Sequence, residues 1–313
     1  MNHDPGSAGA DASADELQPI DIADSVAVVT GGASGIGKGI VGALLRAGDT
    51  VVIADIETDA IDSTVAELST SATEGRLSGI RTDITDESSV RALAEQVYAT
   101  HGKVNLLYNN AGVTSGGGGK PWQQEPNDWR WCFGVNVFGT AFCVSEFVPR
   151  MIESGQPGQI VNTSSGDGGF APVPTASVYA ASKAAVSCFT EALHHNLVSE
   201  ETQLRASVFY PAGGLQRTGL FTAQRNRPEH LQRVGAGTGR RSMTFDEMKT
   251  MLEKAGRDVK EADLDAQGDL VVAATIERRY IITMDLRDTV DLLHRRADAI
   301  GEFDVPPHHG WPG

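Results

Sequence analysis

Near the amino end of the chain, a short apolar run leads directly into a glycine-rich turn, and this junction constrains the fold more than any other feature. Residues 26–29 are typical of a buried strand, and Gly31, Gly35 and Gly37 follow in the spacing G-x-x-x-G-x-G, with a helical pattern that ends at Gly48. A strand, a glycine turn and a helix in this order present backbone N–H groups and a positive helix end to a pyrophosphate. Glycines let the ligand and the helix approach closely. A dinucleotide-binding turn is predicted, and a glycine turn without a ligand is the alternative.

The same order of apolar strand, turn and helix recurs along most of the chain. Further strands are expected at residues 51–54, 80–84, 104–108, 159–163, 206–210 and 280–283. Short apolar runs separated by helical patterns are typical of a parallel sheet that helices cover on both faces. The sequence therefore predicts one α/β domain over residues 25–313, with a carboxyl-terminal extension at residues 285–313.

Composition and charge exclude several classes of function. The chain has 313 residues and a formal net charge of -15, which argues against nucleic-acid binding because phosphate backbones require a basic surface. No run of about 18 apolar residues is present, so no membrane span is expected. The three cysteines are far apart, which favours a reducing cytoplasm over a disulfide framework or a zinc site. No histidine spacing indicates a metal site.

The first 24 residues differ in composition from the rest. Residues 1–24 hold six acidic residues, no lysine or arginine, and many small residues. They lack the basic start and apolar core of a signal peptide. We therefore expect residues 1–24 to be a disordered acidic leader.

Candidate ligand-binding residues stand at or near the carboxyl ends of several predicted strands. Asp55 ends the second strand, Asp83 lies within the third, and turns at residues 109–112 and at Pro211 follow the fourth and the sixth. The carboxyl ends of parallel strands meet at one edge of the sheet, where ligands bind. Asp55 follows the glycine turn by about 20 residues, so its carboxylate can bind the adenosine ribose hydroxyls and repel a 2′-phosphate. Ser34 and Ile56 supply no cation to reverse this preference, which favours NAD over NADP. A turn that only satisfies the backbone remains the other interpretation of residues 109–112.

A possible acid–base pair follows the fifth predicted strand. Ser164 and Ser165 end that strand, and Tyr179 precedes Lys183 by four residues. Residues four apart share a helix face, so the Lys183 ammonium can lie beside the Tyr179 phenol and lower its pKa. Asn136 is a polar residue within an expected helix, where asparagine is disfavoured, so it is either exposed or retained for a task.

A polar segment with an amphipathic helix follows the sixth strand. In residues 216–256, Thr244 and Glu247 form a capping box, and Phe245, Met248, Met251 and Leu252 share one helix face. Methionines adapt to irregular apolar shapes. The segment is expected to be a substrate lid, and permanent packing on the body or on another subunit is equally compatible with the pattern.

Taken together, these residues resemble the short-chain dehydrogenase/reductase family over about residues 25–285. The resemblance rests on residues 30–37, Asp55, Asp83, residues 109–112, Asn136, Ser165, Tyr179 and Lys183. It implies a doubly wound Rossmann sheet of seven parallel strands and a nicotinamide cofactor. It also implies cofactor contacts from Gly31, Ser34, Gly35, Ile36, Gly37, Asp55, Asp83, Ile84, Asn110, Ala111, Gly112, Tyr179, Lys183 and Pro211.

The same resemblance implies a catalytic role for four residues. Tyr179 would be the acid–base group, and Lys183 would lower its pKa and bind the nicotinamide ribose. Ser165 would bind the substrate oxygen, and Asn136 would hold a water in a proton relay.

Departures from the family pattern affect two places. Ser165 and Tyr179 are one residue further apart than usual, so Ser164 is an alternative to Ser165. Pro211 is followed by alanine instead of glycine, and Thr218 lies later than the usual cofactor-binding threonine, with Leu215 as another possible contact. Residues 129–131 and 147–151 also resemble bacterial dehydrogenases of lignin-derived aryl alcohols.

The sequence thus predicts a cytoplasmic NAD-dependent oxidoreductase that interconverts a bulky apolar or aromatic secondary alcohol and its ketone. A homodimer or homotetramer without nucleic-acid or membrane partners is expected. The alternatives are a cofactor-binding regulator without turnover and an NADP-dependent carbonyl reductase. An extended-family epimerase is disfavoured because its usual G-x-x-G-x-x-G turn is not found here.

Overall fold

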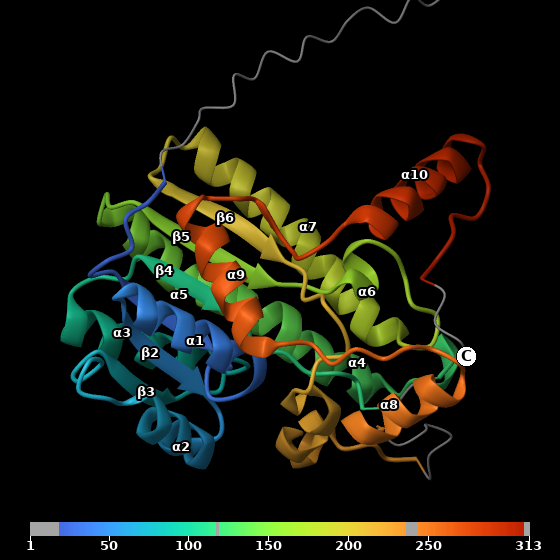
Figure 1. Cartoon of the computed structure of the whole chain (residues 1–313), viewed down its shortest axis with the longest axis horizontal. Helices are drawn as coiled ribbons and strands as arrows, with labels where there is room; N and C mark the ends of the chain where they lie inside the picture. Colours follow the sequence, from blue (N-terminus) through green and yellow to red (C-terminus); the bar gives the residue numbers. More distant parts are fainter. Residues whose placement is uncertain (1–18, 117–118, 236–242, 310–313) are drawn as a thin grey trace, which may run out of the picture.

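The strands form a single sheet in the computed structural model, which describes residues 19–116, 119–235 and 243–309. The strand order is β3-β2-β1-β4-β5-β6-β7, and every neighbouring pair is parallel (Figure 1). The strands are β1 (Val26–Thr30), β2 (Thr50–Asp55), β3 (Leu77–Arg81), β4 (Leu106–Asn109), β5 (Gly158–Thr163), β6 (Leu204–Phe209) and β7 (Ile281–Ile282). The predicted doubly wound, seven-stranded parallel sheet is confirmed.

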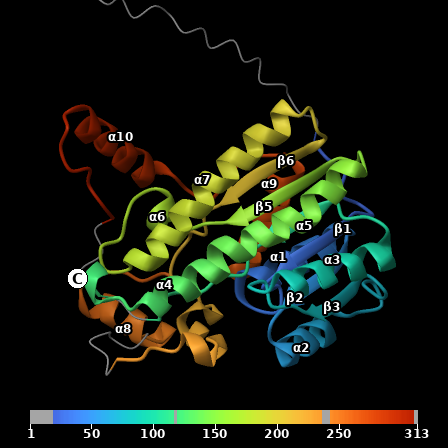
Figure 2. The same ribbon diagram turned by 180° about the vertical axis from the view of Figure 1, so that it is seen from behind.

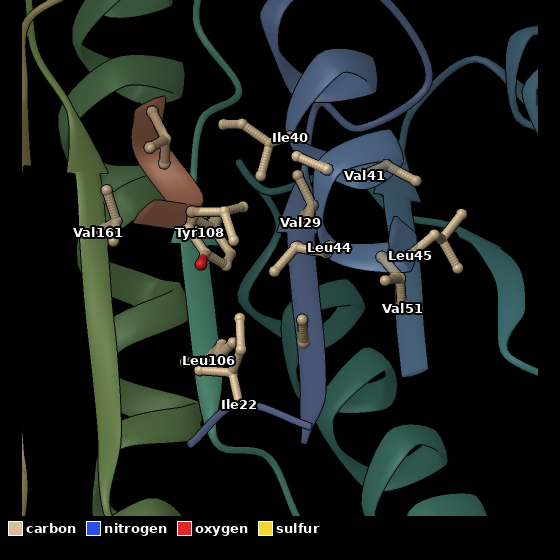
Figure 3. Packing of buried hydrophobic residues seen from close by; sticks show 14 of the residues in the cluster. Ile22, Val29, Ile40, Val41, Leu44, Leu45, Val51, Leu106, Tyr108 and Val161 are labelled. Atoms are coloured by element: carbon tan, nitrogen blue, oxygen red, sulfur yellow. The ribbon is translucent and has the colours of Figure 1, made fainter. Parts of the chain in front are cut away.

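Helices cover both faces of this sheet (Figures 1 and 2). One layer contains α1 (Gly35–Ala47), α2 (Thr58–Leu68) and α9 (Leu264–Ile276), and the other contains α3 (Glu87–His101), α5 (Thr140–Glu153) and α7 (Ser177–Ser199). Val29 packs in the first core and its neighbour Val28 in the second, because successive strand residues face opposite ways. Figure 3 shows Ile40 and Leu44 of α1 in the first core, where each fully buried aliphatic side chain contributes about 1.5–3 kcal/mol.

The direction of winding reverses between β1 and β4. From β1 the chain continues through β2 to the β3 edge, and then it returns to place β4 on the other side of β1. Loops that leave the carboxyl ends of such neighbours diverge and open a crevice. The glycine turn follows β1, and the Asn110–Gly112 loop follows β4, so the fold brings both to this crevice.

One continuous helix runs through residues 126–153 as α4 (Pro126–Phe133), the π-helical η2 (Gly134–Gly139) and α5. Among the described residues, it is the one helix whose length and composition would permit a membrane crossing. The lack of an uninterrupted run of about 18 apolar residues was therefore not sufficient to exclude a candidate membrane span. Phe147 and Met151 of this helix are fully buried in the second core. The helix therefore packs as a covering layer of the sheet.

An insertion lies at the carboxyl edge between β6 and α9. Its described elements are η3 (Gly219–Asn226), η4 (Glu229–Leu231) and α8 (Phe245–Lys254). The Leu215 amide donates to Lys260 O at 2.8 Å, and the Ala262 amide donates to Leu215 O at 3.0 Å, so the two ends of the insertion are joined. The predicted capping box is confirmed by mutual hydrogen bonds between Thr244 and Glu247.

The carboxyl-terminal helix α10 (Arg287–Gly301) projects from the body in both views (Figures 1 and 2). The chain then turns back, and the His309 amide donates to Pro172 O at 3.2 Å. His309, the last described residue, therefore lies beside the segment that leads from β5 to α7.

The bounds of one strand and of the leader were drawn wrongly from the sequence. Strand β3 spans Leu77–Arg81 instead of residues 80–84, and it ends at Arg81 because the Asp83 carboxylate accepts hydrogen bonds from the Thr85 amide and hydroxyl and makes a turn. Residues 19–24, assigned to the leader, pack on the body: Ile22 is buried, and the Ile20 amide donates to Ile276 O at 3.0 Å. The rest of the predicted leader lies outside the described residues.

Candidate active site

The turn after β1 is held to the end of β4 by one threonine. The Thr30 hydroxyl accepts hydrogen bonds from the amides of Asn110 and Ala111 at 3.0 and 3.1 Å. Gly31 adopts a positive φ of 64°, and an added Cβ there would lie 2.8 Å from Ala111 Cα. A side chain at Gly31 would therefore force apart the two loops that border the crevice.

Asp55 ends β2 beside this turn. Its carboxylate accepts hydrogen bonds from the backbone amides of Ala33 and Glu57, each at 3.2 Å. Burial raises the pKa of Asp55, and the two amide hydrogen bonds partly offset this effect. The structure thus places a positioned carboxyl group where an adenosine ribose is expected, while Asp83 and Ile84 line the same cavity from the turn after β3.

Lys183 is the most buried charged group at the other end of the crevice. Its side chain is 3% exposed, and Nζ donates to the Thr163 carbonyl at 2.8 Å. Burial lowers the pKa of Lys183 to about 8. An added Cβ at Gly112 would lie 3.3 Å from Lys183 Nζ, so a glycine there leaves space in front of the ammonium.

Tyr179 lies one helical turn before Lys183, whose Nζ is 5.8 Å from the centre of the phenol ring. The shared helix face predicted from the sequence is present. The expected lowering of the tyrosine pKa is not: burial, followed by the negative charge of Asp167, raises the pKa of Tyr179, while a hydrogen bond with Ser165 acts in the opposite direction. Desolvation raises the pKa because burial penalises the charged phenolate. The phenol is therefore neutral in this structure.

The two adjacent serines are in different environments. The Ser164 hydroxyl donates to Lys183 O at 2.8 Å and meets the Ser187 hydroxyl at 2.8 Å. The Ser165 hydroxyl hydrogen-bonds Tyr179 and accepts from the Asp167 amide at 3.2 Å. Ser164 therefore supports α7, and Ser165 is the serine that hydrogen-bonds the Tyr179 phenol.

Asn136 lies in the π-helical turn η2 and is buried. Its Oδ1 accepts from the Val113 amide at 2.8 Å, and its Nδ2 donates to Val113 O and the Ser182 hydroxyl at 3.0 and 2.9 Å. The Thr140 hydroxyl donates to the Asn136 carbonyl, which compensates for the altered helix pairing. The side chain thus fastens the loop after β4 to the helix that carries Tyr179, and its role in holding a water remains a prediction.

One cavity of about 1650 Å³ is lined by all but two of the cofactor and catalytic candidates. The two exceptions are Asn136 and Gly37, and Gly37 packs beneath the glycine turn. A pocket for a single small ligand has about 300–1,000 Å³, so this cavity has room for a dinucleotide and a substrate together. Pro211 and Leu215 also line it, and Thr218 lies against Gly35 of the glycine turn.

The insertion supplies part of the cavity wall. Met248 and Met251 are half-buried and line the cavity, and the buried Leu252 lines it as well. Phe245 is buried against Phe221 and Arg217, which belong to the insertion. The apolar face of α8 is thus divided: Phe245 packs within the insertion, and Leu252 and the two methionines line the cavity.

Several site residues were missing from the sequence-based catalytic set. Asp167 follows Ser165 by two residues and acts on Tyr179 through its charge, and Ser182 joins Asn136 to the Tyr179 carbonyl. Both are close in sequence to predicted residues, so a check of all polar neighbours could have found them. Arg225 lines the cavity and pairs with Glu57, which is distant in sequence, so no local pattern could have indicated it.

The fold and site define a dinucleotide-binding α/β protein with a serine, tyrosine and lysine at one end of its groove. Residues 25–228 match the family model of the short chain dehydrogenases. The chain belongs to this family, and it is an oxidoreductase whose fold binds a nicotinamide cofactor.

Known proteins of the family share much of the chain. A C alpha-dehydrogenase of Sphingobium sp. is 38% identical over 210 residues, which are 66% of this chain and 66% of that protein. A 1-deoxy-11-beta-hydroxypentalenate dehydrogenase of Streptomyces avermitilis is 35% identical over a stretch that covers 62% of this chain and 68% of that protein. The predicted family and its likeness to a C alpha-dehydrogenase are confirmed.

A solved structure extends the likeness beyond the sequence match. The crystal structure of a short chain dehydrogenase/reductase from Burkholderia phymatum in complex with NAD has a TM-score of 0.81 and 33% identity. The structural alignment covers 93% of this chain and 99% of the Burkholderia phymatum chain. The alignment therefore includes most of the insertion and carboxyl-terminal regions as well as the sheet.

Proposed function

We propose that this protein transfers a hydride between NAD(H) and a secondary alcohol or ketone that is bulky and apolar or aromatic. The observation that carries the proposal is that one cavity is lined by Asp55, by Ser165, Tyr179 and Lys183, and by Met248. One cavity thus offers a ribose-binding carboxyl group, a proton-transfer group and an apolar wall.

The residues fit a nicotinamide dinucleotide. Gly31 and Gly35 allow close approach of a pyrophosphate, and Asp55 can accept from adenosine ribose hydroxyls. An ammonium has three N–H donors, and the Thr163 carbonyl occupies one donor of Lys183, so a ribose hydroxyl can accept another. When bound, the cofactor supplies the hydride acceptor or donor.

The protein's own groups supply the proton. A neutral Tyr179 can donate its O–H proton to a ketone oxygen, and Ser165 can hydrogen-bond the same oxygen. In the opposite direction Tyr179 must first lose a proton, and the raised pKa means that this loss requires a higher pH. We therefore expect alcohol oxidation to rise with pH across the alkaline range more steeply than ketone reduction.

The proposed substrate class rests on the cavity wall and on two relatives. Met248 and Met251 provide an adaptable apolar surface. The relatives are named a C alpha-dehydrogenase and a hydroxypentalenate dehydrogenase. We propose an aryl or polycyclic secondary alcohol, acted on by a cytoplasmic enzyme.

A homodimer or homotetramer is part of the same proposal. Trp129, Phe138 and Ile152 are exposed large apolar residues on the helix of residues 126–153. A contiguous exposed apolar patch is typical of contact surfaces, and the proposal requires these side chains to belong to one. Light scattering of the purified protein tests this part, and a monomer at micromolar concentration would contradict it.

The function is tested by following absorbance of the reduced cofactor with aryl, polycyclic and short aliphatic secondary alcohols, with NAD and with NADP. We expect kcat/KM to favour NAD by more than about tenfold, because Asp55 would lie against a 2′-phosphate and like charges in contact are costly. Equal use of the two cofactors would refute the role of Asp55, and a preference for NADP would favour the carbonyl reductase alternative. Tight NADH binding without turnover of any alcohol would favour the regulator.

A further inference from the structure

Part of the insertion crosses the cofactor end of the cavity. We call residues 216–231 the strap. Near its start, Thr218 lies against the glycine turn, since a Cβ added at Gly35 would be 3.1 Å from Thr218 Cγ2. Further along, Arg225 and Asn226 line the cavity together with Asp55. The strap therefore passes from the pyrophosphate-binding turn to the ribose-binding end of β2.

The first fastening point of the strap is Glu57, two residues after Asp55. The Arg225 guanidinium donates through Nε and Nη2 to the two carboxylate oxygens of Glu57, with 3.1 Å for the Nε contact. Asn226 Nδ2 donates to the same carboxylate at 2.9 Å. The hydrogen bond from Arg225 lowers the pKa of Glu57, so this fastening is ionic at neutral pH.

The second fastening point is buried. The Arg227 guanidinium donates to Asp128 of α4 at 2.9 Å, and the two side chains are 1% and 0% exposed. Arg233 also donates to this carboxylate through two nitrogens, each at 2.9 Å. Separating such a buried pair would leave uncompensated buried charges, which is costly. This end of the strap therefore stays attached.

The two fastenings therefore differ in strength. Arg225 and Glu57 are 39% and 30% exposed, and exposed ion pairs are weak and screened by salt. We therefore expect the Glu57 end to open first, while Asp128 and Arg227 remain paired. Opening at Glu57 exposes the part of the cavity that contains Asp55, which is where the adenosine half of a dinucleotide enters or leaves.

We propose that Glu57 is a positioning residue that holds the strap closed over the adenosine end of the cofactor groove and thereby sets the rate of NADH release. The proposal rests on the proposed function, because it requires NADH in this groove. Glu57 acts through Arg225 and Asn226, and the contacts of Asp55 with the Glu57 amide do not involve the Glu57 side chain.

The experiment measures NADH dissociation by stopped-flow fluorescence in the full-length protein. The variants are Glu57→Gln, Arg225→Gln and the double variant, and Glu277→Gln is the matched control, because Glu277 also pairs with an exposed arginine, Arg279, but does not line the cavity. We expect each single variant to release NADH about 5-fold faster and the double variant to be no faster than either single variant, since the pair acts as a unit. The control should match the wild type.

Two further readouts separate a strap from a general structural effect. Raising the salt concentration should speed NADH release from the wild type but not from the double variant, because only the wild type retains the ion pair. The isotope effect on hydride transfer at saturating cofactor should stay unchanged. NADH release at the wild-type rate from Arg225→Gln, or single effects that multiply in the double variant, would overturn the proposal. Failure of the wild type to bind NADH at all would instead overturn the proposed function.

Discussion

A buried carboxyl group remote from the active site provides a quantitative test of the electrostatic reasoning. Asp49 joins α1 to β2 and is 0% exposed, and neither of its carboxylate oxygens has a hydrogen-bond partner in the described structure. Burial raises the pKa of Asp49 from 3.8 to about 7, and the backbone amide of Asp49 itself and then the charge of Arg76 only partly offset this effect. The Arg76 guanidinium instead donates to the Asp49 backbone carbonyl at 3.0 Å.

The effect of Asp49 on stability follows from the difference between its folded and unfolded pKa values. Below pH 3.8 both states hold the proton, and the carboxyl group carries no penalty. As the pH rises, the unfolded state loses the proton first, so stability falls until the pH passes about 7, where the full penalty is reached. At 1.36 kcal/mol per unit, the penalty is about 4 kcal/mol above pH 7, and it grows by about 2.5 kcal/mol between pH 5 and pH 8.

We therefore expect Asp49→Asn to gain about 2.5 kcal/mol over the wild type between pH 5 and pH 8. Urea denaturation across this range measures the difference, with the exposed Asp62→Asn as the control. A constant offset from the new amide cancels, because only the change with pH is used. Parallel stability curves for Asp49→Asn and the wild type would show that Asp49 is ionised or hydrogen-bonded in solution, and the reasoning would be refuted.

Two other predictions concern Tyr179 in the candidate active site and the buried ion pair between Asp128 and Arg227. Tyr179→Phe should lower turnover at least about 10²-fold with little change in NADH affinity, because it removes only the transferable proton, and steady-state kinetics with a fluorescence titration measure both. Retention of a tenth of the activity would contradict the assignment. Asp128→Asn should destabilise the protein by about 3–5 kcal/mol, because the buried Arg227 loses its counter-charge, whereas Arg233→Gln should be milder since Arg233 is less buried. Equal unfolding midpoints for Asp128→Asn and the wild type would refute this account.

The sequence was sufficient for features that depend on local spacing. Apolar periodicity identified the strands, and the glycine turn and Asp55 were placed correctly because each ends a strand or begins a helix. The helical repeat alone placed Tyr179 and Lys183 on one face. The parallel, doubly wound arrangement also followed, because alternating strands and helices are typical of a parallel sheet that helices cover on both faces.

Other features depend on burial and on contacts between distant segments. The sign of the Tyr179 pKa shift was wrong because spacing reveals a nearby lysine but not the loss of water around the phenol. The π-helical turn that orients Asn136 leaves no regular sequence pattern. The pairing of Glu57 with Arg225 joins residues 168 positions apart, and only the folded chain brings them together.

The strap contacts α8, the helix whose methionines line the cavity, and this contact leads to a last prediction. Phe221 of the strap packs edge-on against Phe245 of α8 at 5.7 Å between ring centres, and the Arg217 guanidinium lies 3.9 Å from the centre of the same Phe245 ring. Met248, one turn further along α8, lines the cavity. Opening of the strap should therefore shift α8, which carries Met248 and Met251 in the cavity wall. A substrate that packs on these two methionines favours the closed strap.

By linkage, a ligand that binds the closed form more tightly must reduce the population of the open form. We therefore expect a bulky aryl alcohol to slow NADH release severalfold in a stopped-flow displacement experiment, and a small aliphatic alcohol to have no effect. Phe245→Ala should weaken this effect of the aryl alcohol, because the link between strap and wall is removed. If the aryl alcohol leaves NADH release unchanged while it is turned over, the strap and the wall move independently, and cofactor exchange is separate from substrate binding.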